Sequence, residues 1–226
     1  MNNISDERHT DIETADIYEM LNQGGELLYE GNEGLAVRLG GVMLCNISDN
    51  GILSRLLDPA NNGSISLYCV HDENAAAFIK NKCGMHGINR CSQWVYTGES
   101  FDLRGSDADI NAVCADELEL IAGHSSESKE YLAERIAAGC IWKLTSGGGL
   151  AGFIGMHEAG SIGMLQVLPD HRRKGIGRKL LEFAVNRQIE CGSISYMHVV
   201  DGNEASIALQ QSISAVKCIA PALWVY

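Results

Sequence analysis

Residues 162–192 constrain the fold more than any other stretch, because a strand, a short basic loop and a helix follow one another there without interruption. The apolar run that ends at Pro169 predicts a strand. Apolar residues then recur at helical spacing from Leu180 to Ile189 and predict a helix that ends at Gly192. This succession indicates an α/β structure, in which the loop lies where the strand ends and the helix begins.

The loop has the composition of an anion-binding site. Its basic residues occupy four of seven positions: Arg172, Arg173, Lys174 and Arg178. The first N–H groups of a helix lack partners within the helix, and the helix dipole places partial positive charge beside them. Gly175 and Gly177 leave that backbone open to close approach by a ligand. The loop therefore predicts a pyrophosphate-binding site, and a solvated basic turn is the alternative.

The glycine spacing excludes two other phosphate loops. The sequence has no G-x-x-x-x-G-K-[ST] segment here, and no third glycine completes a G-x-G-x-x-G motif. What remains is R-x-x-G-x-G after an apolar strand that ends in Val167-Leu168-Pro169. This pattern resembles the acyl-CoA loop of the GNAT superfamily, the GCN5-related N-acetyltransferases, and the resemblance extends over roughly residues 112–226.

The resemblance implies a GNAT fold, a mixed central sheet flanked by helices, with acetyl-CoA as cosubstrate. It implies that the backbone of Leu165, Gln166 and Val167 pairs with the pantetheine arm, and that the Val167 N–H polarises the thioester carbonyl. The loop residues expected at the pyrophosphate are Arg172, Arg173, Lys174, Gly175, Ile176, Gly177 and Arg178. Asn203 and Ser206, after the next strand, are expected to contact the cofactor or an ordered water.

The reaction implied by the resemblance is direct attack of a primary amine on acetyl-CoA, which calls for an acid and a base. Many family members have a tyrosine as acid where this chain has Gln210. Glutamine cannot donate its proton as an acid, although its NH₂ group can hydrogen-bond the sulfur. His198 is the candidate base, with a purely structural histidine as the alternative. Tyr196 is expected to pack in the core, and His157 and His171 to lie in turns.

An internal repeat divides the chain. Residues 64–76 align with residues 193–205 without a gap, and each copy is later followed by Trp-Val-Tyr, at 94–96 and 224–226. The first copy has no counterpart of the glycine loop. We therefore predict a degenerate GNAT-like α/β domain over 1–105 and a GNAT catalytic domain over 106–226, with a chance repeat as the alternative.

Hydrophobic periodicity predicts the remaining elements. Residues 1–10 are expected to be disordered. The expected helices are 11–29, with a break or end at Gly24, and 52–57, 74–82, 115–124, 128–138 and 204–213. The expected strands are 34–39, 42–47, 64–70, 91–96, 140–144, 151–156, 162–167, 194–200 and 222–226.

Composition restricts the class of protein and its partners. The chain of 226 residues is 46% hydrophobic and 20% charged, without an apolar run of about 20 residues or an apolar leader, which predicts a cytoplasmic globular protein. A net charge of −12 disfavours nucleic acid or an anionic membrane as partner. Eight scattered cysteines and seven histidines show no metal-ligand spacing, so neither a metal nor a disulfide is expected.

These observations favour an N-acetyltransferase that acts on a primary amine of a small molecule, an amino acid or a peptide, as a monomer or homodimer. A narrower resemblance is to the glycine N-acyltransferase-like group, which also pairs a degenerate N-terminal unit with a functional one. A non-catalytic acyl-CoA-binding or regulatory module is the alternative, and an adaptor whose basic loop meets an acidic partner is another. The acceptor and the acyl chain length stay open.

Overall fold

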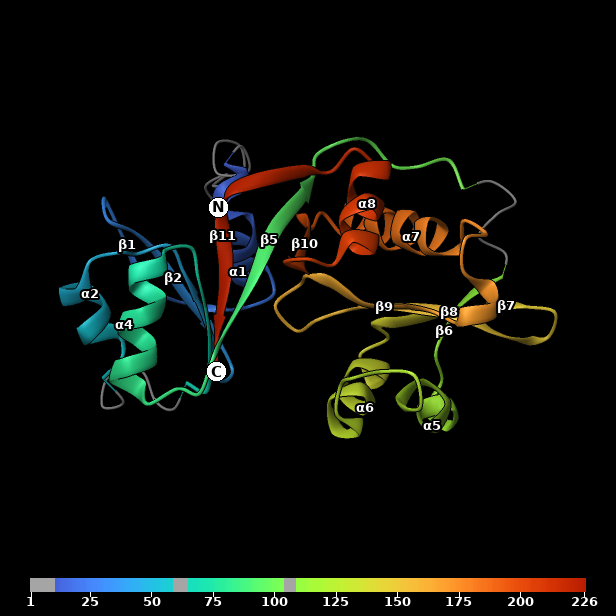
Figure 1. Ribbon diagram of the computed structural model, residues 1–226, viewed down its shortest axis with the longest axis horizontal. Helices are drawn as coiled ribbons and strands as arrows, with labels where there is room; N and C mark the ends of the chain where they lie inside the picture. Colours follow the sequence, from blue (N-terminus) through green and yellow to red (C-terminus); the bar gives the residue numbers. More distant parts are fainter. Residues whose placement is uncertain (1–10, 59–64, 104–108) are drawn as a thin grey trace, which may run out of the picture.

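The computed structural model describes residues 11–58, 65–103 and 109–226, which form two sheets flanked by helices (Figure 1). In the first half the elements are a 3₁₀ turn (Ile12–Thr14), α1 (Ala15–Asn22), β1 (Glu26–Gly31), β2 (Gly34–Leu39), β3 (Val42–Cys45), α2 (Asn50–Leu56), β4 (Leu67–Val70), α4 (Glu73–Cys83) and β5 (Ile88–Tyr96). The disorder expected for 1–10 and the boundary expected between 105 and 106 lie outside the described residues.

The second half begins with β6 (Ile110–Ala112) and contains the predicted strand, loop and helix. Its other elements are α5 (Leu118–Ala122), α6 (Lys129–Ala137), β7 (Ile141–Ser146), β8 (Gly149–Met156), β9 (Ile162–Val167), α7 (Ile176–Glu190), β10 (Ser195–Val200), α8 (Glu204–Ser212) and β11 (Val216–Val225). Short 3₁₀ turns occupy Ala115–Glu117 and Pro169–His171. The mixed α/β class expected from the sequence is confirmed.

The helix predicted over 11–29 is wrong in its second part. Helix α1 ends at Asn22, and β1 follows from Glu26 and pairs with β2. Gly24 has a φ of +91°, outside the helical region, so the chain leaves the helix there. The residues that follow satisfy their backbone groups in the sheet instead. The short strand β6 was also not predicted, because three residues carry too little periodicity.

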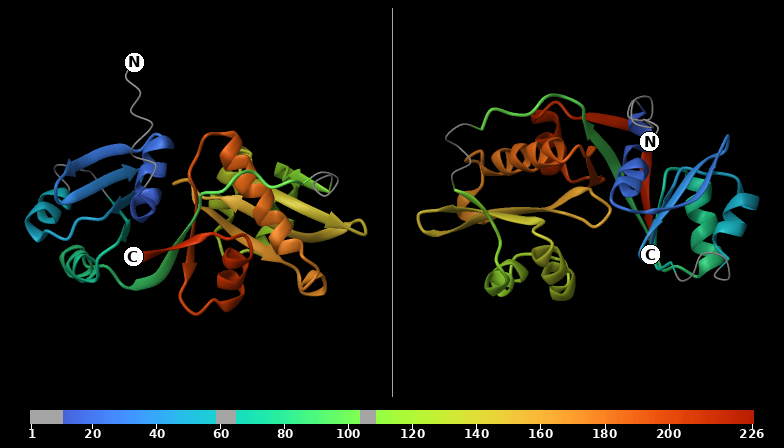
Figure 2. Two further views of the ribbon diagram at one scale, coloured as in Figure 1. Left: turned by 90° about the horizontal axis from the view of Figure 1, so that it is seen from above. Right: turned by 180° about the vertical axis from the view of Figure 1, so that it is seen from behind.

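The larger sheet contains strands from both halves of the chain. Its order is β1-β2-β3-β4-β11-β5-β10, and the smaller sheet has the order β6-β7-β8-β9. The pair β3–β4 is parallel, and the other pairs are antiparallel. The two views of Figure 2 show β5 and β11 running between the two halves of the molecule.

The two repeats exchange their last strands. The sequence repeat makes β4 equivalent to β10, and the two strands that end in Trp-Val-Tyr, β5 and β11, equivalent to each other. Strand β11 nevertheless pairs with β4, with Leu223 opposite Val70, while β5 pairs with β10, with Ser195 opposite Tyr96. Each half thus completes the sheet of the other, as in domain swapping within one chain.

This exchange predicts that the second half does not fold alone. A fragment of residues 106–226 would lack β5, which pairs with β10, and both β4 and β5, which pair with β11, so we expect no cooperative urea unfolding of that fragment. Mixing it with a fragment of residues 1–105 should restore a cooperative transition followed by far-ultraviolet circular dichroism. A cooperative transition of the isolated second half would contradict this expectation.

The helices cover the two sheets in separate layers. Helices α2 and α4 pack on one face of the larger sheet through Leu53 and Ile79, both without exposed surface. Helix α7 packs on one face of the smaller sheet, through Leu180 and Ala184. Helices α5 and α6 cover the opposite face of the smaller sheet, through Leu132 and its neighbours (Figure 1). Each apolar face of the smaller sheet is thereby buried.

A buried polar network fixes α1 against strands of both halves. The fully buried Asp16 carboxylate lies 3.0 Å from His71 Nε2 and 3.4 Å from His198 Nε2. Burial alone would raise the pKa of Asp16, but the two imidazoles outweigh it and hold the pKa well below its ordinary value of 3.8. Burial alone would lower the pKa of His71, but the Asp16 charge raises it above 6.5. The Asp16–His71 pair is therefore a buried ion pair.

We expect Asp16→Asn to lower the free energy of unfolding by about 3–5 kcal/mol near pH 6, because it leaves His71 buried without a counter-charge. The contribution of His71 is complete below its ordinary pKa of 6.5 and is lost as the pH rises through the raised value. The contribution of Asp16 is present above its ordinary pKa of 3.8 and is lost in acid. The penalty should therefore be largest between those limits.

Urea unfolding of both proteins at about pH 5.5 and about pH 8.5 measures this difference. Glu134→Gln, on the exposed side of α6, is the control and should show no such dependence. A penalty for Asp16→Asn that stays constant between the two pH values would contradict the ion pair.

Candidate functional site

The sheets separate between β9 and β10. Among the strands of the described residues, β9 pairs with β8 alone and β10 pairs with β5 alone, although β9 and β10 contact each other. Each strand therefore has one edge without a strand neighbour, and such an edge can hydrogen-bond an extended ligand. From the family resemblance, we expect pantetheine to pair with this edge of β9.

The pairing pattern shows which backbone groups lie at this edge. The Leu168 N–H donates to the Ala151 carbonyl at 3.0 Å, so the next pair inward, Val167 opposite Gly152, is one whose N–H and C=O point away from the partner strand. The Val167 carbonyl accepts a hydrogen bond from Arg172 Nε at 3.0 Å, in agreement with that direction. The Val167 N–H therefore points toward the open edge.

A bulge bends β9 in its middle. Met164 has a φ of +53°, and the register with β8 shifts opposite it, between Phe153 and Gly155. A bulge turns backbone groups out of the regular ladder and is frequent beside active sites. The side chain of Met164 packs with the residues of α5 and α6, whereas that of Leu165 packs with those of α7.

The loop after β9 leads directly into the N-terminus of α7. Gly175 is the N-cap with a φ of +78°, and no side chain caps this helix, the longest of the described elements. Helices α2, α4, α6 and α8 have side-chain caps. The N–H groups of the first turn of α7 thus remain available to an anion.

The two loop glycines differ in what the fold requires of them. Gly175 needs its left-handed conformation, whereas a Cβ on Gly177 would lie 3.5 Å from Val167 Cγ2, an ordinary contact. We expect Gly175→Ala to lower the free energy of unfolding by about 1 kcal/mol and Gly177→Ala to leave it unchanged or raise it by up to about 1 kcal/mol, since alanine favours helix. Urea unfolding of both variants tests this, and equal losses would contradict it.

The basic residues of the loop take different positions. Arg172 donates a hydrogen bond to the Val167 carbonyl, and Arg178 forms an ion pair with Glu182 at 2.7 Å. Lys174, with His171 and Lys179, lines a hollow of about 320 Å³ between the loop and the end of β7. The side chains of Arg172, Lys174 and Arg178 thus lie near the N-terminal end of α7.

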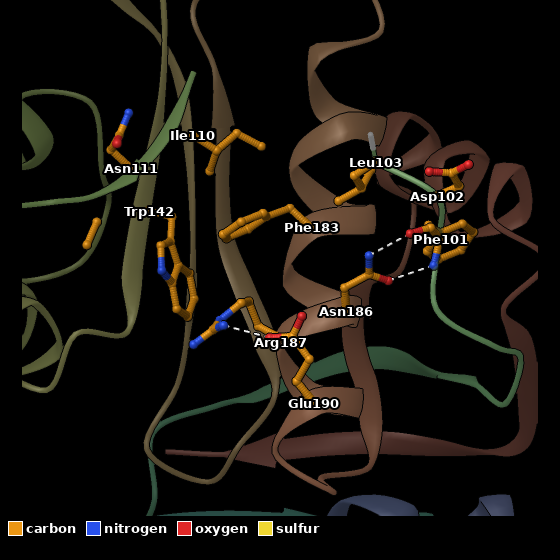
Figure 3. Close-up of a pocket in the computed structure, with 11 residues that line it drawn as sticks. Phe101, Asp102, Leu103, Ile110, Asn111, Trp142, Phe183, Asn186, Arg187 and Glu190 are labelled. Carbon is orange, nitrogen blue, oxygen red and sulfur yellow. Dashed lines mark hydrogen bonds and ion pairs between the residues drawn. The ribbon is translucent and has the colours of Figure 1, made fainter. Parts of the chain in front are cut away.

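A larger hollow, of about 830 Å³, lies along α7 and away from this loop (Figure 3). Trp142 and Phe183 meet edge to face in it, and Arg187 pairs with Glu190 at 2.6 Å. None of its lining residues belongs to β9 or to the glycine loop. Size alone therefore does not make it the site that the motif indicates.

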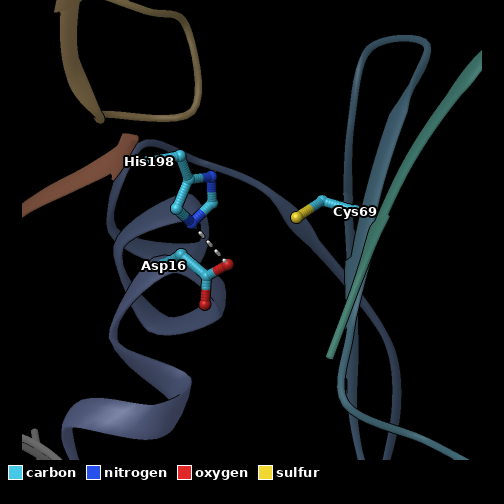
Figure 4. Close-up of side chains that lie close together, drawn as sticks. All are labelled: Asp16, Cys69 and His198. Carbon is cyan, nitrogen blue, oxygen red and sulfur yellow. Dashed lines mark ion pairs between the residues drawn. The ribbon is translucent and has the colours of Figure 1, made fainter. Parts of the chain in front are cut away.

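His198 points toward α1 and the first half of the chain (Figure 4). Its side chain is 7% exposed, and its Nε2 lies 2.9 Å from Gln93 Oε1. Trp224 Nε1–H donates to its Nδ1 at 3.2 Å. The Nδ1 must therefore be unprotonated and the Nε2 must carry the proton. Neither nitrogen is free to take a proton from a substrate in this arrangement.

Asp16, Cys69 and His198 offer ligand-type atoms within 4.8 Å of one another (Figure 4). A metal ion on His198 Nε2 would require a proton on Nδ1, where Trp224 donates its own proton. The hydrogen-bond pattern thus fits a network of His and Asp better than a metal site.

The other predicted residues lie near α8 and β9. Gln210 is 4% exposed, and its Oε1 is buried without a hydrogen-bond partner among the described residues. Asn203 caps α8, because its side-chain oxygen accepts a hydrogen bond from the Ser206 N–H at 3.2 Å. Gln166 Nε2 donates to the His124 carbonyl at 3.2 Å.

Sequence reasoning assigned His157 only to a turn. It does lie at the start of the β8–β9 turn, but its Nδ1 also lies 2.9 Å from the Tyr131 hydroxyl of α6. No sequence pattern connects residues 26 positions apart on different elements, so only the tertiary structure shows the pair. The expectation for Tyr196 is confirmed, since it is 1% exposed and its hydroxyl donates to the Ala159 carbonyl.

Comparison with known families agrees with this geometry. Residues 111–212 match the model of the Acetyltransferase (GNAT) family. Residues 111–212 form a GNAT domain. The match spans β6 to α8 and so contains the open edge of β9, the glycine loop and α7. The resemblance inferred from R-x-x-G-x-G is confirmed at the level of the family.

Solved structures share the fold over nearly the whole chain. A Drosophila protein has a TM-score of 0.68 at 17% identity and covers 95% of this chain and 89% of its own. A putative GNAT acetyltransferase from Novosphingobium aromaticivorans has a TM-score of 0.58 at 16% identity, over 95% and 98% of the two chains. A GCN5-related N-acetyltransferase from Kribbella flavida has a TM-score of 0.57 at 11% identity, over 95% and 93%.

At these identities, the likeness concerns the fold, which these proteins share with both halves of this chain. No curated protein sequence gave a significant match. Within the parts of the chain that the structure describes, no helix has both the length and the apolar character that crossing a membrane requires.

Proposed function

We propose that this protein is an N-acetyltransferase that uses acetyl-CoA and acetylates a primary amine of a small molecule, amino acid or peptide by direct attack. The observation that carries the proposal is the continuity of the open β9 edge with the uncapped N-terminus of α7. The edge offers backbone partners to the amides of pantetheine, and the helix end offers N–H groups and Arg172 or Lys174 to the pyrophosphate.

Polarisation of the thioester falls to the backbone of β9. The Val167 N–H is the proposed donor to the carbonyl oxygen, because it points to the open edge and is held by the sheet. A fixed donor of this kind stabilises the developing oxyanion without reorganisation, and alignment of amine and thioester supplies much of the remaining acceleration.

Gln210 is the proposed neighbour of the departing sulfur, where its amide would donate a hydrogen bond. Its buried and unpartnered oxygen supports a position inside the site rather than on the surface. Since a thiol has a pKa of about 8.5, the thiolate can leave near neutral pH without an acid. The absence of a tyrosine at this position is therefore expected to slow the transfer without preventing it.

The first half of the chain is proposed to close one side of the acceptor region. Helix α1 lies against the face of β10 that bears Tyr196 and His198, and Glu19 of α1 accepts the Ile194 N–H at 2.8 Å. No loop of the R-x-x-G-x-G type occurs in this half. Its contribution would therefore be to shape the site.

Calorimetric titration of acetyl-CoA into the protein tests the cofactor site. We expect micromolar binding by the unaltered protein and none by Gly177→Trp, because the indole would fill the space between the helix end and the strand. Ala138→Trp, an exposed position after α6, is the matched control and should bind normally. The absence of binding by the unaltered protein would exclude the transferase and the acyl-CoA module, and would leave the adaptor.

Thiol release from acetyl-CoA in the presence of spermidine, tyramine, glycine or a short peptide separates the enzyme from a binding module. The substitution of the usual tyrosine by Gln210 is the one feature that favours the non-catalytic alternative. We expect amine-dependent release with at least one of these acceptors. Tight acetyl-CoA binding with no release above hydrolysis for any amine would support the module.

A further inference from the structure

Two cysteines stand at the two ends of the segment that carries α5 and α6. Cys114 comes two residues after β6 ends, and Cys140 is the residue before β7 begins. Both are free thiols. Because β6 and β7 are neighbours in the smaller sheet, both ends of the segment lie beside this strand pair.

The register of β6 and β7 places the two cysteines opposite each other. The strands keep one antiparallel register over the whole length of β6. One residue beyond its end, the Val113 N–H still donates to the Ile141 carbonyl at 2.9 Å, in the same register. The next opposed pair in this register is Cys114 with Cys140. Spacing along the chain carries no such information, so the scattered cysteines gave no reason to expect a disulfide.

The hydrogen bonds around the two cysteines show which kind of pair they form. Antiparallel pairs alternate, and those without mutual hydrogen bonds have Cα atoms only about 4.5 Å apart. The Cys140 carbonyl accepts the Met156 N–H at 2.9 Å and so faces β8. The Cys114 N–H donates to the Glu117 carboxylate at 3.0 Å, not to β7. The cysteines therefore take the closer kind of pair, and a disulfide spans Cα separations of about 4.4–6.8 Å, which leaves room for β6 to turn away.

The two thiols belong to one face of the sheet and can be reached from solvent. Side chains alternate along a strand, so Cys114 shares the face of Ala112 and Cys140 that of Trp142, and those two residues are themselves opposed. Cys114 is exposed and Cys140 is half-buried. The Cys140 thiol hydrogen-bonds the Ala138 carbonyl at 3.4 Å on the exposed surface. A small oxidant can therefore approach both sulfur atoms.

We propose that Cys114 and Cys140 form a redox site, at which a low-molecular-weight disulfide such as oxidised glutathione converts the two thiols into a disulfide bond. The thiolate of Cys114, the more exposed residue, attacks one sulfur of the small disulfide, a mixed disulfide forms and the first small thiol leaves. The Cys140 thiolate then attacks the Cys114 sulfur, and the second small thiol leaves. The two protons of the protein thiols end on the two released thiols. The cysteine pair loses two electrons, and the small disulfide gains them.

The bond ties together both ends of the segment that covers one face of the smaller sheet. Helices α5 and α6 lie between the two cysteines and pack on that face through Ile121 and Leu132, both without exposed surface. A cross-link of this kind stabilises a protein mainly by restricting the unfolded chain. The oxidised protein is therefore more stable than the reduced one. A reducing compartment keeps such a pair as thiols, so the bond forms when the surroundings become oxidising.

The test treats the full chain with oxidised glutathione, blocks the remaining thiols with N-ethylmaleimide and maps the tryptic peptides by mass spectrometry without reduction. We expect a cross-link between the peptides that contain Cys114 and Cys140, and dithiothreitol should reverse it. The urea midpoint of the oxidised protein should exceed that of the reduced protein by about 1 M. Cys191→Ser removes another exposed thiol and is the matched control, which should keep the cross-link and the higher midpoint. Cys114→Ser should lose both.

Three results would overturn the redox site: mixed disulfides with glutathione but no cross-link, a cross-link from either cysteine to Cys191, or no reaction of the two thiols. A cross-link that leaves the urea midpoint unchanged would overturn its stabilising effect. Peptide mapping of the unaltered chain decides even if Cys114→Ser does not fold. None of these measurements requires acetyl-CoA or an amine, so this proposal and the proposed function can fail independently.

Discussion

The separation of β9 from β10 is the constraint on which the rest of the structure depends. A strand edge inside a protein normally has a neighbour, because unpaired backbone groups are costly to bury. Here β10 pairs with β5 in the larger sheet, whereas β9 pairs with β8 in the smaller sheet. The exchange of β5 and β11 between the repeats therefore does more than join the halves, since it determines which sheet β10 completes and leaves the β9 edge open.

Three histidines connect elements that lie far apart in the chain. His71 contacts Asp16 of α1. His198 hydrogen-bonds Gln93 of β5 and Trp224 of β11, the two exchanged strands. The Nδ1 of His157 lies 2.9 Å from the Tyr131 hydroxyl and so connects the β8–β9 turn to α6. The partners of the ring nitrogens therefore say more about the role of a histidine than its position along a strand does.

Much of the fold was predictable because the periodicity of the second half is strong. The strand that ends at Val167, the loop and the helix through Ile189 follow patterns of apolar residues that differ between strand and helix. The family also followed from R-x-x-G-x-G. The error in the first half came from Leu27 and its neighbours, whose apolar side chains fit a helical spacing although the backbone pairs in the edge strand β1. The approach of Tyr131 to His157 has no counterpart in any local pattern.

The sequence by itself determined the α/β class, the GNAT domain and the basic loop at the end of a strand, because each depends on the order of residues within one short stretch. It also predicted two related units in tandem. Only the tertiary structure decided that β5 and β11 pair with the strands of the opposite half, that Asp16 meets His71 and His198, and that the His157 ring packs against Gly163. These depend on contacts between residues far apart in the chain, and the pairing of backbone edges, which selects those contacts, is nearly independent of side-chain identity.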